Sequence, residues 1–322
     1  MQAADFQSTI EIKETEACNK CGICRENCEF LKKYNLTIGD VQKLSDKAYH
    51  CFLCGKCTAV CPKGIDGRNV MLKLRQIKTA ENNGKPDTKG VHFLLAEKSD
   101  YRYKNDSALT ERVLSTGKPV NGNTKDSILF PGCNFSAYYP KTTAYLMDLM
   151  KNNGIGTMFD CCGKPIAELG MQQQEQVILN RLTAKLKKAN VSEVIMVCPN
   201  CYYFLKDRIP VRVVSIYEKL MELGISCQTV RAERIFLPCP DRYEKVWFEQ
   251  IQKYISGKFE QIDDGNCCGL GGCAYITEKR LSNKMAARIN ENAKGKAYVY
   301  CASCAGKIGA AGSSEILHLL PE

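Results

Sequence analysis

Short apolar runs alternate with longer amphipathic segments over the last two thirds of the chain. Residues 128–130 and 235–237 are apolar runs of strand length, whereas Ile178, Leu182 and Leu186 recur at the spacing of one helix face. Strands that alternate with helices predict parallel sheets covered by helices. We expect strands at residues 128–130, 157–159, 194–197, 211–214, 235–237, 259–262, 297–300 and 315–320. We expect helices around residues 144–150, 166–189, 217–223, 244–255 and 277–292.

The first quarter of the chain has a different pattern. Residues 30–49 and 68–77 carry apolar residues at helical spacing, which predicts a mostly helical part. Residues 79–126 are richer in Asn, Lys, Asp, Gly and Pro and are typical of a linker, with short packed elements expected at residues 91–96 and 108–114. We interpret His92 in this stretch and His318 near the end of the chain as structural residues rather than ligands.

One arrangement of cysteines occurs twice after residue 132. A single cysteine is followed by 27 residues, an adjacent cysteine pair with a glycine, and a closing C-x-x-C, which lies 35 residues after the pair in the first copy and 32 in the second. These cysteines follow the ends of expected strands, where ligands bind in open parallel sheets. The five thiols of each copy should therefore converge on one site. The copies are Cys133, Cys161, Cys162, Cys198, Cys201 and Cys239, Cys267, Cys268, Cys301, Cys304.

A second cysteine motif, C-x2-C-x2-C-x3-C, occurs twice near the N-terminus, and its second copy ends in Cys-Pro. This spacing is typical of two-cluster bacterial ferredoxins, in which the fourth cysteine of each motif binds the other cluster. Zinc modules usually set their C-x-x-C pairs apart and add His or Cys partners, so we favour iron-sulfur clusters over zinc. The expected ligand sets are Cys18, Cys21, Cys24 with Cys61, and Cys51, Cys54, Cys57 with Cys28.

Composition narrows the function further. With 322 residues, 44% of them hydrophobic, the chain is long enough for two or three domains. Twenty cysteines in a chain without a secretory pattern in residues 1–14 favour metal ligation over disulfides. The net charge of +10 does not predict nucleic-acid binding, because thiolate-bound clusters offset part of it and aromatic residues are not interleaved with the basic ones. We expect a cytoplasmic protein without its own membrane span, associated with a membrane only through a partner.

A cubane cluster needs four thiolates, so the fifth cysteine of each repeat requires an explanation. Adjacent residues of a strand point to opposite sides, and both members of a Cys-Cys pair can bind together only if the backbone turns. Gly163 and Gly269 permit that turn. A cluster distorted from the cube, with one thiolate shared between irons, would use all five cysteines.

The repeats resemble the CCG, or cysteine-rich, domains of heterodisulfide reductase catalytic subunits. The resemblance is carried by residues 130–140, 161–165, 198–201 and 267–272, and the motif ahead of them resembles the small ferredoxin subunit of the same enzymes. The same combination is similar to the iron-sulfur subunits of anaerobic glycerol-3-phosphate dehydrogenase and of glycolate and lactate oxidases. The resemblance implies an α+β multi-domain protein with two pseudo-symmetric α/β domains. The implied domains are residues 1–78 (helical two-cluster ferredoxin domain), 79–126 (linker), 127–233 (first CCG domain) and 234–322 (second CCG domain).

The resemblance also implies a function. Two cubane 4Fe-4S clusters would pass electrons to two noncubane 4Fe-4S clusters, one per repeat, that face each other and reduce or form a small-molecule disulfide. The chain departs from the family around Cys239, where Pro240 follows and the usual Asp and His are missing, so no proton donor is identified. The alternative is an electron-transfer subunit that relays electrons between a flavin dehydrogenase and a quinone or another carrier.

Several residues remain outside this scheme. Four residues near the expected cluster ends could assist the chemistry, but we favour a packing or surface role for each: Tyr138, Tyr139, Lys164 and Arg242. We expect Cys227 to be a small buried residue, and we favour a spare thiol over a ligand of the second cluster for Cys273. The chain contains no G-x-G-x-x-G loop between a strand and a helix and no G-x4-G-K-[ST] loop. Electrons should therefore come from a partner protein, such as a flavoprotein, a hydrogenase or a ferredoxin-linked subunit.

Overall fold

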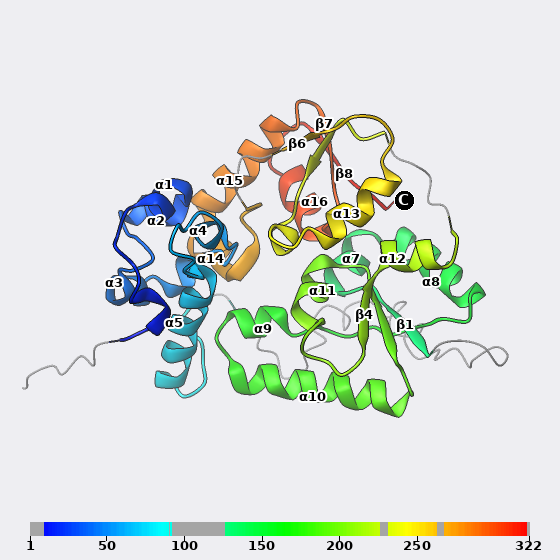
Figure 1. The fold of residues 1–322 in the computed structure, drawn as a ribbon, viewed down its shortest axis with the longest axis horizontal. Coiled ribbons are helices and arrows are strands. Elements are labelled where there is room, and N and C mark those ends of the chain that lie inside the picture. Colours follow the sequence, from blue (N-terminus) through cyan, green and yellow to red (C-terminus); the bar gives the residue numbers. More distant parts are fainter. Residues whose placement is uncertain (1–9, 90, 92–125, 226–230, 263–266, 321–322) are drawn as a thin grey trace, which may run out of the picture.

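The computed structural model describes residues 10–89, 91, 126–225, 231–262 and 267–320. In these residues a helical N-terminal part lies beside two parallel sheets, each accompanied by helices (Figure 1). The mixed α/β architecture expected from the sequence is confirmed. His92, Cys227, the expected element at residues 108–114 and all but Val91 of the one at residues 91–96 lie outside the described residues.

The N-terminal part is built from short helices around α5 (Gly67–Glu81). This helix begins at Asp66, whose carboxylate accepts a hydrogen bond from the Asn69 backbone N–H at 3.0 Å and so caps the helix. Its buried face carries Val70, Met71 and Leu74. The shorter elements are η1 (Lys13–Thr15), α1 (Ile23–Asn27), α2 (Glu29–Tyr34), α3 (Val41–Ser45), η2 (Ala48–His50) and α4 (Lys56–Ala59).

The first sheet has the strand order β2-β1-β3-β4, with every pair parallel. In its inner strand β3, Val194, Ile195 and Met196 are fully buried, as expected of a strand covered on both faces. The strands are β1 (Ser127–Phe130), β2 (Gly156–Thr157), β3 (Glu193–Met196) and β4 (Arg212–Ser215). The helices are α7 (Cys133–Tyr138), α8 (Pro140–Asn152), α9 (Lys164–Glu168), α10 (Gln172–Lys188), α11 (Pro199–Leu205) and α12 (Ile216–Glu222).

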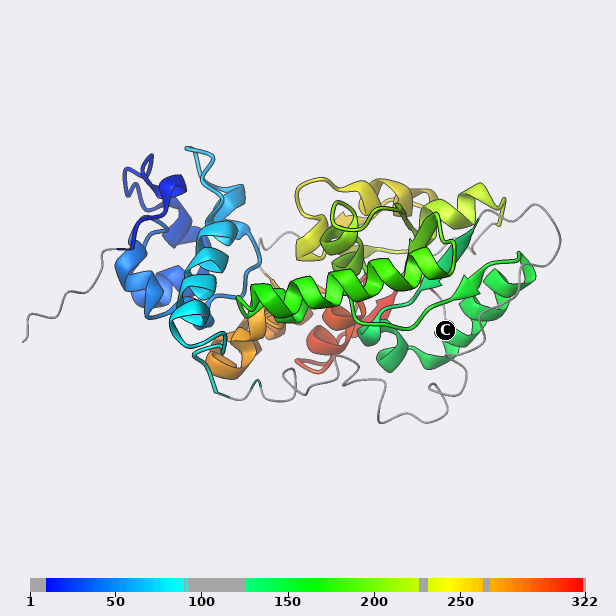
Figure 2. The ribbon, with the colours of Figure 1, turned by 90° about the horizontal axis from the view of Figure 1, so that it is seen from below.

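The second sheet repeats this order as β6-β5-β7-β8, again with parallel pairs. Figures 1 and 2 show it on one side of the first sheet, with α10 running along the opposite side. Its strands are β5 (Arg234–Phe236), β6 (Glu260–Gln261), β7 (Lys296–Val299) and β8 (Glu315–His318). Its helices are η3 (Cys239–Asp241), α13 (Val246–Ile251), η4 (Gln252–Tyr254), η5 (Gly271–Cys273), α14 (Ala274–Thr277), α15 (Lys279–Asn292) and α16 (Ala302–Gly309).

The strand order explains where the cysteines gather. Successive connections leave β1 and β3 in opposite directions across the sheet, and a crevice opens outside the carboxyl ends of such neighbouring strands. Cys133 and Cys198 follow β1 and β3, and Cys239 and Cys301 follow the equivalent strands β5 and β7. The sequence-based expectation that these cysteines follow strand ends is confirmed.

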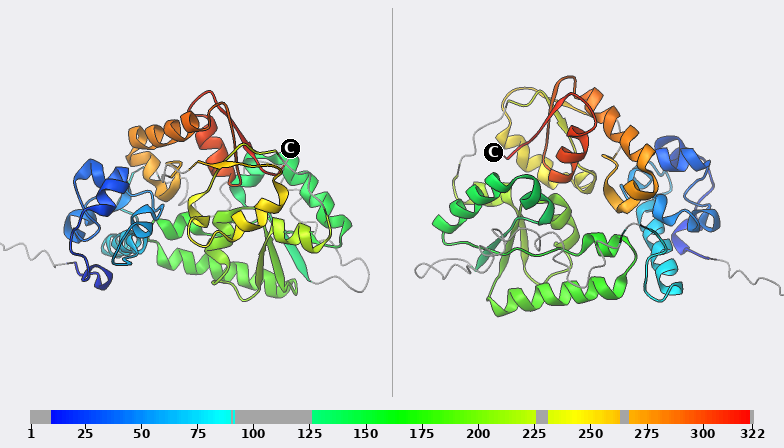
Figure 3. Two further views of the ribbon diagram at one scale, coloured as in Figure 1. Left: turned by 45° about the horizontal axis from the view of Figure 1, so that its top comes forward. Right: turned by 180° about the vertical axis from the view of Figure 1, so that it is seen from behind.

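The prediction of one long helix at residues 166–189 is wrong, because the structure has two helices, α9 and α10, separated at residues 169–171. Gly170 adopts a left-handed conformation with φ of +85°. A Cβ atom at this position would lie 2.5 Å from the carbonyl carbon and oxygen of Arg75 in α5. The break is therefore where the N-terminal part packs against the first sheet domain, and this tertiary contact overrides local helix propensity (Figure 3).

Replacing Gly170 with alanine is expected to destabilise the protein by about 2–4 kcal/mol, since it combines left-handed backbone strain with overlap of α5. Gly224 offers a matched control, with φ of +65° and no atom within 4 Å of an added Cβ. Urea unfolding of the two variants under anaerobic conditions measures the difference. Equal losses of stability in Gly170→Ala and Gly224→Ala would show that the contact with α5 contributes nothing.

Candidate functional site

The N-terminal cysteines line two separate cavities. One cavity is lined by all four members of the first expected set, Cys18, Cys21, Cys24 and Cys61. The other is lined by all four members of the second expected set, Cys28, Cys51, Cys54 and Cys57. The fold thus brings the fourth cysteine of each motif to the other motif, while ligation of a cluster by these sets stays a prediction.

The surroundings of both N-terminal sets fit thiolate ligands of an iron-sulfur core. The backbone N–H groups of Ile38 and Leu53 donate to the Sγ atoms of Cys24 and Cys51 at 3.4 Å, as is usual for cluster-bound thiolates. Glycine leaves the space that the sulfur atoms need, since a Cβ on Gly67 would lie 2.5 Å from the Cys57 Sγ.

The electrostatics of the second N-terminal set point the same way. Burial, followed by the neighbouring thiols of Cys51 and Cys28, raises the pKa of Cys57 well above its ordinary value. In the same set, the contact with Cys267 lowers the pKa of Cys54 to about 5. Thiolates held close together repel one another, and an iron core supplies positive charge that offsets the repulsion. In the described residues, no group of three or more His, Cys, Asp or Glu side chains is arranged to hold a single metal ion.

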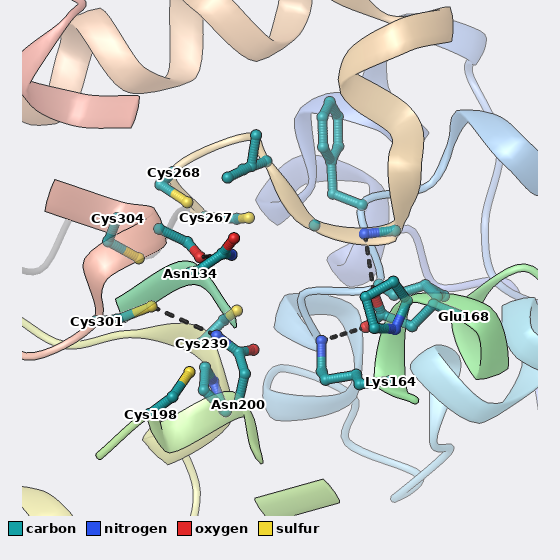
Figure 4. Close-up of a pocket in the computed structure, with 18 of the residues that line it drawn as sticks. Asn134, Lys164, Glu168, Cys198, Asn200, Cys239, Cys267, Cys268, Cys301 and Cys304 are labelled. Atoms are coloured by element: carbon teal, nitrogen blue, oxygen red, sulfur yellow. Dashed lines mark hydrogen bonds and ion pairs between the residues drawn. The ribbon is translucent and has the colours of Figure 1, made fainter. Parts of the chain in front are cut away.

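The repeat cysteines meet at a cavity of about 160 Å³ between the two sheet domains (Figure 4). Thiols from both copies line it, so the two sets face a common space. The lining thiols of the two copies are Cys133, Cys162, Cys198, Cys201, Cys239, Cys267, Cys268, Cys301 and Cys304.

The five thiols of each copy lie next to one another as a connected series, in the same order in both copies. In the first copy the series runs from Cys133 through Cys161, Cys162 and Cys201 to Cys198. In the second it runs from Cys239 through Cys267, Cys268 and Cys304 to Cys301. The structure therefore brings together all ten cysteines that the repeat pattern selected, in two equivalent groups.

The turn expected within each Cys-Cys-Gly segment is confirmed. Gly163 and Gly269 have φ of +86° and +81°, a conformation that glycine adopts without strain. Their N–H groups donate back to Cys161 and Cys267 Sγ at 3.4 and 3.3 Å. Both members of each pair can therefore belong to one ligand group.

The buried carboxylate of Asp160 fixes the backbone at Cys161 in the first copy. Asp160 accepts a hydrogen bond from the Cys161 backbone N–H at 2.7 Å, and its side chain pairs with Lys185 Nζ at 2.7 Å and with Arg181. Burial raises the pKa of Asp160, and Lys185 and Arg181 oppose that effect. Lys185 and Arg181 thus help to fix the Cys161 backbone through Asp160. The signal available in the sequence was the pair of basic residues one turn apart on α10.

One end of the central cavity carries charged side chains. Lys164 Nζ lies 2.5 Å from Glu168 Oε1, and Arg68 Nη2 lies 3.7 Å from the same oxygen. The other oxygen of Glu168 accepts a hydrogen bond from the Gly272 N–H at 3.3 Å. Burial would raise the pKa of Glu168, but Lys164 and Arg68 outweigh it and lower the pKa. Lys164 therefore lines the site instead of only packing or lying at the surface, and Arg68 and Glu168 are lining residues that sequence reasoning missed.

Amide side chains of the first copy reach across to the second. Asn200 Nδ2 donates to Cys301 Sγ at 3.4 Å, and Asn134 Nδ2 donates to Ser303 Oγ at 2.5 Å. Asn134 Oδ1 is buried without a hydrogen-bond partner among the described residues. These contacts hold the two groups of thiols against the same cavity.

The acid nearest to Cys239 does not replace the missing proton donor. Asp241 is fully buried and accepts hydrogen bonds from Tyr300 Oη at 2.7 Å and from the backbone N–H groups of Trp247 and Phe248 at 3.2 and 2.9 Å. It is not among the described residues that line the central cavity. Asp241 therefore has a structural role at the start of α13.

Cys273 lines the central cavity but takes no part in the series of neighbouring thiols described above. Burial raises its pKa to about 12. The interpretation of Cys273 as a spare thiol stays a prediction.

His318 is buried beside the rings of Phe135 and Tyr139, and its Nδ1 accepts a hydrogen bond from the Leu320 N–H at 3.1 Å. It is not one of the described residues that line the cavity, in agreement with a structural role. Burial lowers its pKa to about 3 from the ordinary 6.5. Between about pH 6.5 and pH 3 the unfolded chain binds a proton at His318 that the folded protein does not bind. The contribution of neutral His318 to stability is therefore fully present above about pH 6.5 and is lost as the pH falls.

We expect the unfolding free energy to fall by about 1.4 kcal/mol per pH unit from this residue alone between about pH 6 and pH 4. The His318→Asn variant keeps an acceptor for the Leu320 N–H but cannot titrate. Anaerobic urea unfolding at about pH 7 and about pH 5.5 should show a steeper loss in the native protein than in this variant. The same slope in both proteins would contradict the buried neutral state of His318.

Comparison with known proteins agrees with this site. A family model described as a 4Fe-4S dicluster domain matches residues 14–65, and one described as a cysteine-rich domain, CCG, matches residues 128–206. The chain is therefore an iron-sulfur protein that combines these two kinds of domain, and it is related to subunits of redox enzymes. In particular, it is a distant relative of a subunit of heterodisulfide reductase from methanogens of the genus Methanosarcina.

The similarities are spread over most of the chain at low identity. An uncharacterized iron-sulfur protein of Methanocaldococcus jannaschii is 24% identical over 259 residues, which are 74% of this chain and 51% of that protein. A subunit of the dihydromethanophenazine:CoB–CoM heterodisulfide reductase of Methanosarcina mazei is 21% identical over 332 residues, covering 82% of this chain and 80% of the relative. An EtfAB:quinone oxidoreductase of Syntrophomonas wolfei is 23% identical over 264 residues, which are 71% of this chain and 37% of that protein.

The chain spans about half the length of the Methanocaldococcus jannaschii relative and of a second uncharacterized iron-sulfur protein, from Methanococcus maripaludis. Among solved structures, an aspartate racemase homologue from Pyrococcus horikoshii OT3 covers 61% of this chain at 12% identity, and its TM-score of 0.29 carries no argument. Across the described residues, every helix is too short or too polar to traverse a lipid bilayer.

Proposed function

We propose that this chain is an iron-sulfur oxidoreductase of heterodisulfide reductase type, which reduces or forms a small-molecule disulfide in the central cavity. The two N-terminal sets would hold cubane 4Fe-4S clusters, and the two groups of five repeat cysteines would hold noncubane 4Fe-4S clusters. The observation that carries this proposal is the cavity itself, because thiols from both copies line one space of about 160 Å³. A disulfide placed there lies between two equivalent groups.

The stoichiometry of disulfide reduction suits this arrangement. Breaking one S–S bond consumes two electrons and two protons and releases two thiols. When bound, the clusters would supply the electrons one at a time. The residues of this chain bind and orient the disulfide, and Asn134 Oδ1 is a buried acceptor without a partner among the described residues at its edge. Phe52, Leu53 and Leu270 supply apolar surface that excludes water from the same space.

The proposed domain plan follows the repeated geometry. Both sheets have the same strand order, and both groups of thiols are connected in the same order. These equivalences support two pseudo-symmetric CCG domains at residues 127–233 and 234–322, preceded by the ferredoxin domain at residues 1–78 and the linker at residues 79–126.

The alternative function is a relay that passes electrons between a flavin dehydrogenase and a quinone or another carrier. Two observations favour it: Asp241 is engaged away from the cavity, so the missing proton donor is not restored, and one relative is an EtfAB:quinone oxidoreductase. In both functions a redox partner protein exchanges electrons with the N-terminal part, and we place the protein in the cytoplasm, with membrane contact only through a partner.

Reduced protein mixed anaerobically with small-molecule disulfides distinguishes the two functions. Reoxidation of the protein with release of two thiols per disulfide supports the reductase. Fast electron transfer to a quinone analogue with a flavoprotein donor, and no thiol release from any disulfide, supports the relay and contradicts the reductase.

A further inference from the structure

The two kinds of cysteine set touch at one point. Cys54 belongs to the second N-terminal set and Cys267 to the second repeat, and both line the cavity formed by that N-terminal set. In contrast, none of the described cysteines of the first repeat lines either N-terminal cavity. The contact between the N-terminal part and the two repeat sets is therefore asymmetric.

Two consecutive residues bind the two sides of this contact together. Arg242 follows Cys239 by three positions, and its Nη1 donates to the Cys54 carbonyl oxygen at 3.1 Å. Tyr243 donates through its hydroxyl to the Gly55 carbonyl oxygen. A Cβ on Gly55 would lie 2.7 Å from the same hydroxyl, so glycine permits this approach. The second sheet domain thus binds the backbone at Cys54 and Gly55 through two hydrogen bonds.

Arg242 also places a permanent positive charge against both sets. Its guanidinium is anchored at the Cys54 carbonyl oxygen, and the residue lies three positions after Cys239 in the chain. The guanidinium cannot lose its proton in a protein, so its charge stays fixed at this contact. Positive charge beside thiolate-bound metal stabilises the reduced state, which carries one more electron, and raises the reduction potential.

We infer that Arg242 is a positioning residue that fixes the contact between Cys54 and Cys267 and makes the second repeat set easier to reduce than the first. The inference rests on the proposed function, because it concerns the same cysteine sets. It assigns the two repeat sets unequal roles: the second is the one that exchanges electrons with the N-terminal part. The sequence did not indicate this role, because Cys54 and Arg242 are far apart along the chain and meet only in the fold.

Redox titration of the whole protein, followed by electron paramagnetic resonance, tests the inference. We expect Arg242→Gln to shift the reduction equilibrium of the two centres nearest to it about tenfold toward the oxidised state, about 59 mV for a one-electron couple. The other two centres should keep their potentials. Arg242→Lys keeps the charge and should restore most of the potential. Iron content is measured in each variant. If Arg242→Gln loses a cluster, the potentials of Arg242→Lys are compared with those of the native protein instead.

Two further variants serve as controls. Tyr243→Phe removes the hydroxyl contact but leaves the charge, and Lys253→Gln removes an exposed charge from the same domain. Neither should shift any potential. Unchanged potentials in Arg242→Gln, or an equal shift of all four centres, would overturn the inference. Failure of the proposed function has a different signature, which is a native protein that reduces no disulfide while its measured potentials still respond to Arg242→Gln.

Discussion

Replacing Arg75 with methionine is expected to destabilise the protein by about 3–5 kcal/mol, the largest effect we predict for a residue outside the cysteine sets. Arg75 is fully buried and donates to four backbone carbonyls. The acceptors are Ala48 at 2.9 Å, Cys51 at 2.6 Å, Glu168 at 2.6 Å and Gly272 at 2.8 Å. One side chain thus joins the N-terminal part to both sheet domains, and methionine would leave these acceptors buried without a donor. Anaerobic urea unfolding of the protein measures the loss.

The control for this experiment is Lys187→Met, which makes the same kind of replacement at an exposed position of α10. We expect its effect to stay within about 0.5 kcal/mol, as for most surface substitutions. A similarly small effect of Arg75→Met would show that the three parts of the molecule are held together by other contacts.

Replacing Cys268 with serine is expected to remove one of the four proposed clusters and to lower disulfide reduction at least about a hundredfold. Cys268 lies in the middle of the second series of thiols, between Cys267 and Cys304. The iron content should fall by about four atoms per chain, while the signals of the two cubane clusters remain. Iron analysis, electron paramagnetic resonance and thiol release measure the three effects.

Cys273→Ser is the matched control for that prediction, because Cys273 lines the same cavity but lies outside the series of thiols. It should keep its full iron content. Loss of iron from Cys273→Ser, or full iron content with unchanged turnover in Cys268→Ser, would contradict the assignment of five ligands per repeat.

The fold is predictable from the sequence where local pattern decides. Short apolar runs located the strands, and the spacing of cysteines selected thiols that the structure gathers at strand ends. The helix around Gly170 was predicted without its break, because the reason for the break lies in α5, almost a hundred positions earlier in the chain. Local periodicity contains no information about such a contact.

The polar surroundings of the site were beyond prediction for the same reason. Arg75, Glu168 and Asp160 act through partners that the fold alone brings near, and each would be an ordinary charged residue in a helix or loop. Charged residues are rarely fully buried unless they are paired, and the partners cannot be chosen without the structure. Spacing therefore revealed the candidate ligands, while the residues that position them emerged only from the fold.

The two repeat sets differ in their contact with the N-terminal part, and this difference sets the order in which electrons would reach them. The second set touches the N-terminal part through Cys267, whereas the first set faces the second across the central cavity. A disulfide bound in the cavity would lie between a set that adjoins the electron supply and a set that does not. This order is consistent with the delivery of electrons one at a time.

Iron and acid-labile sulfide analysis of anaerobically purified protein, combined with Mössbauer spectroscopy, tests the central claim most directly. The claim that the ten repeat cysteines hold two iron-sulfur centres, in addition to the two of the N-terminal part, predicts about 16 iron atoms per chain and two kinds of cluster. About eight iron atoms in cubane clusters alone, or stoichiometric zinc with little iron, would contradict it.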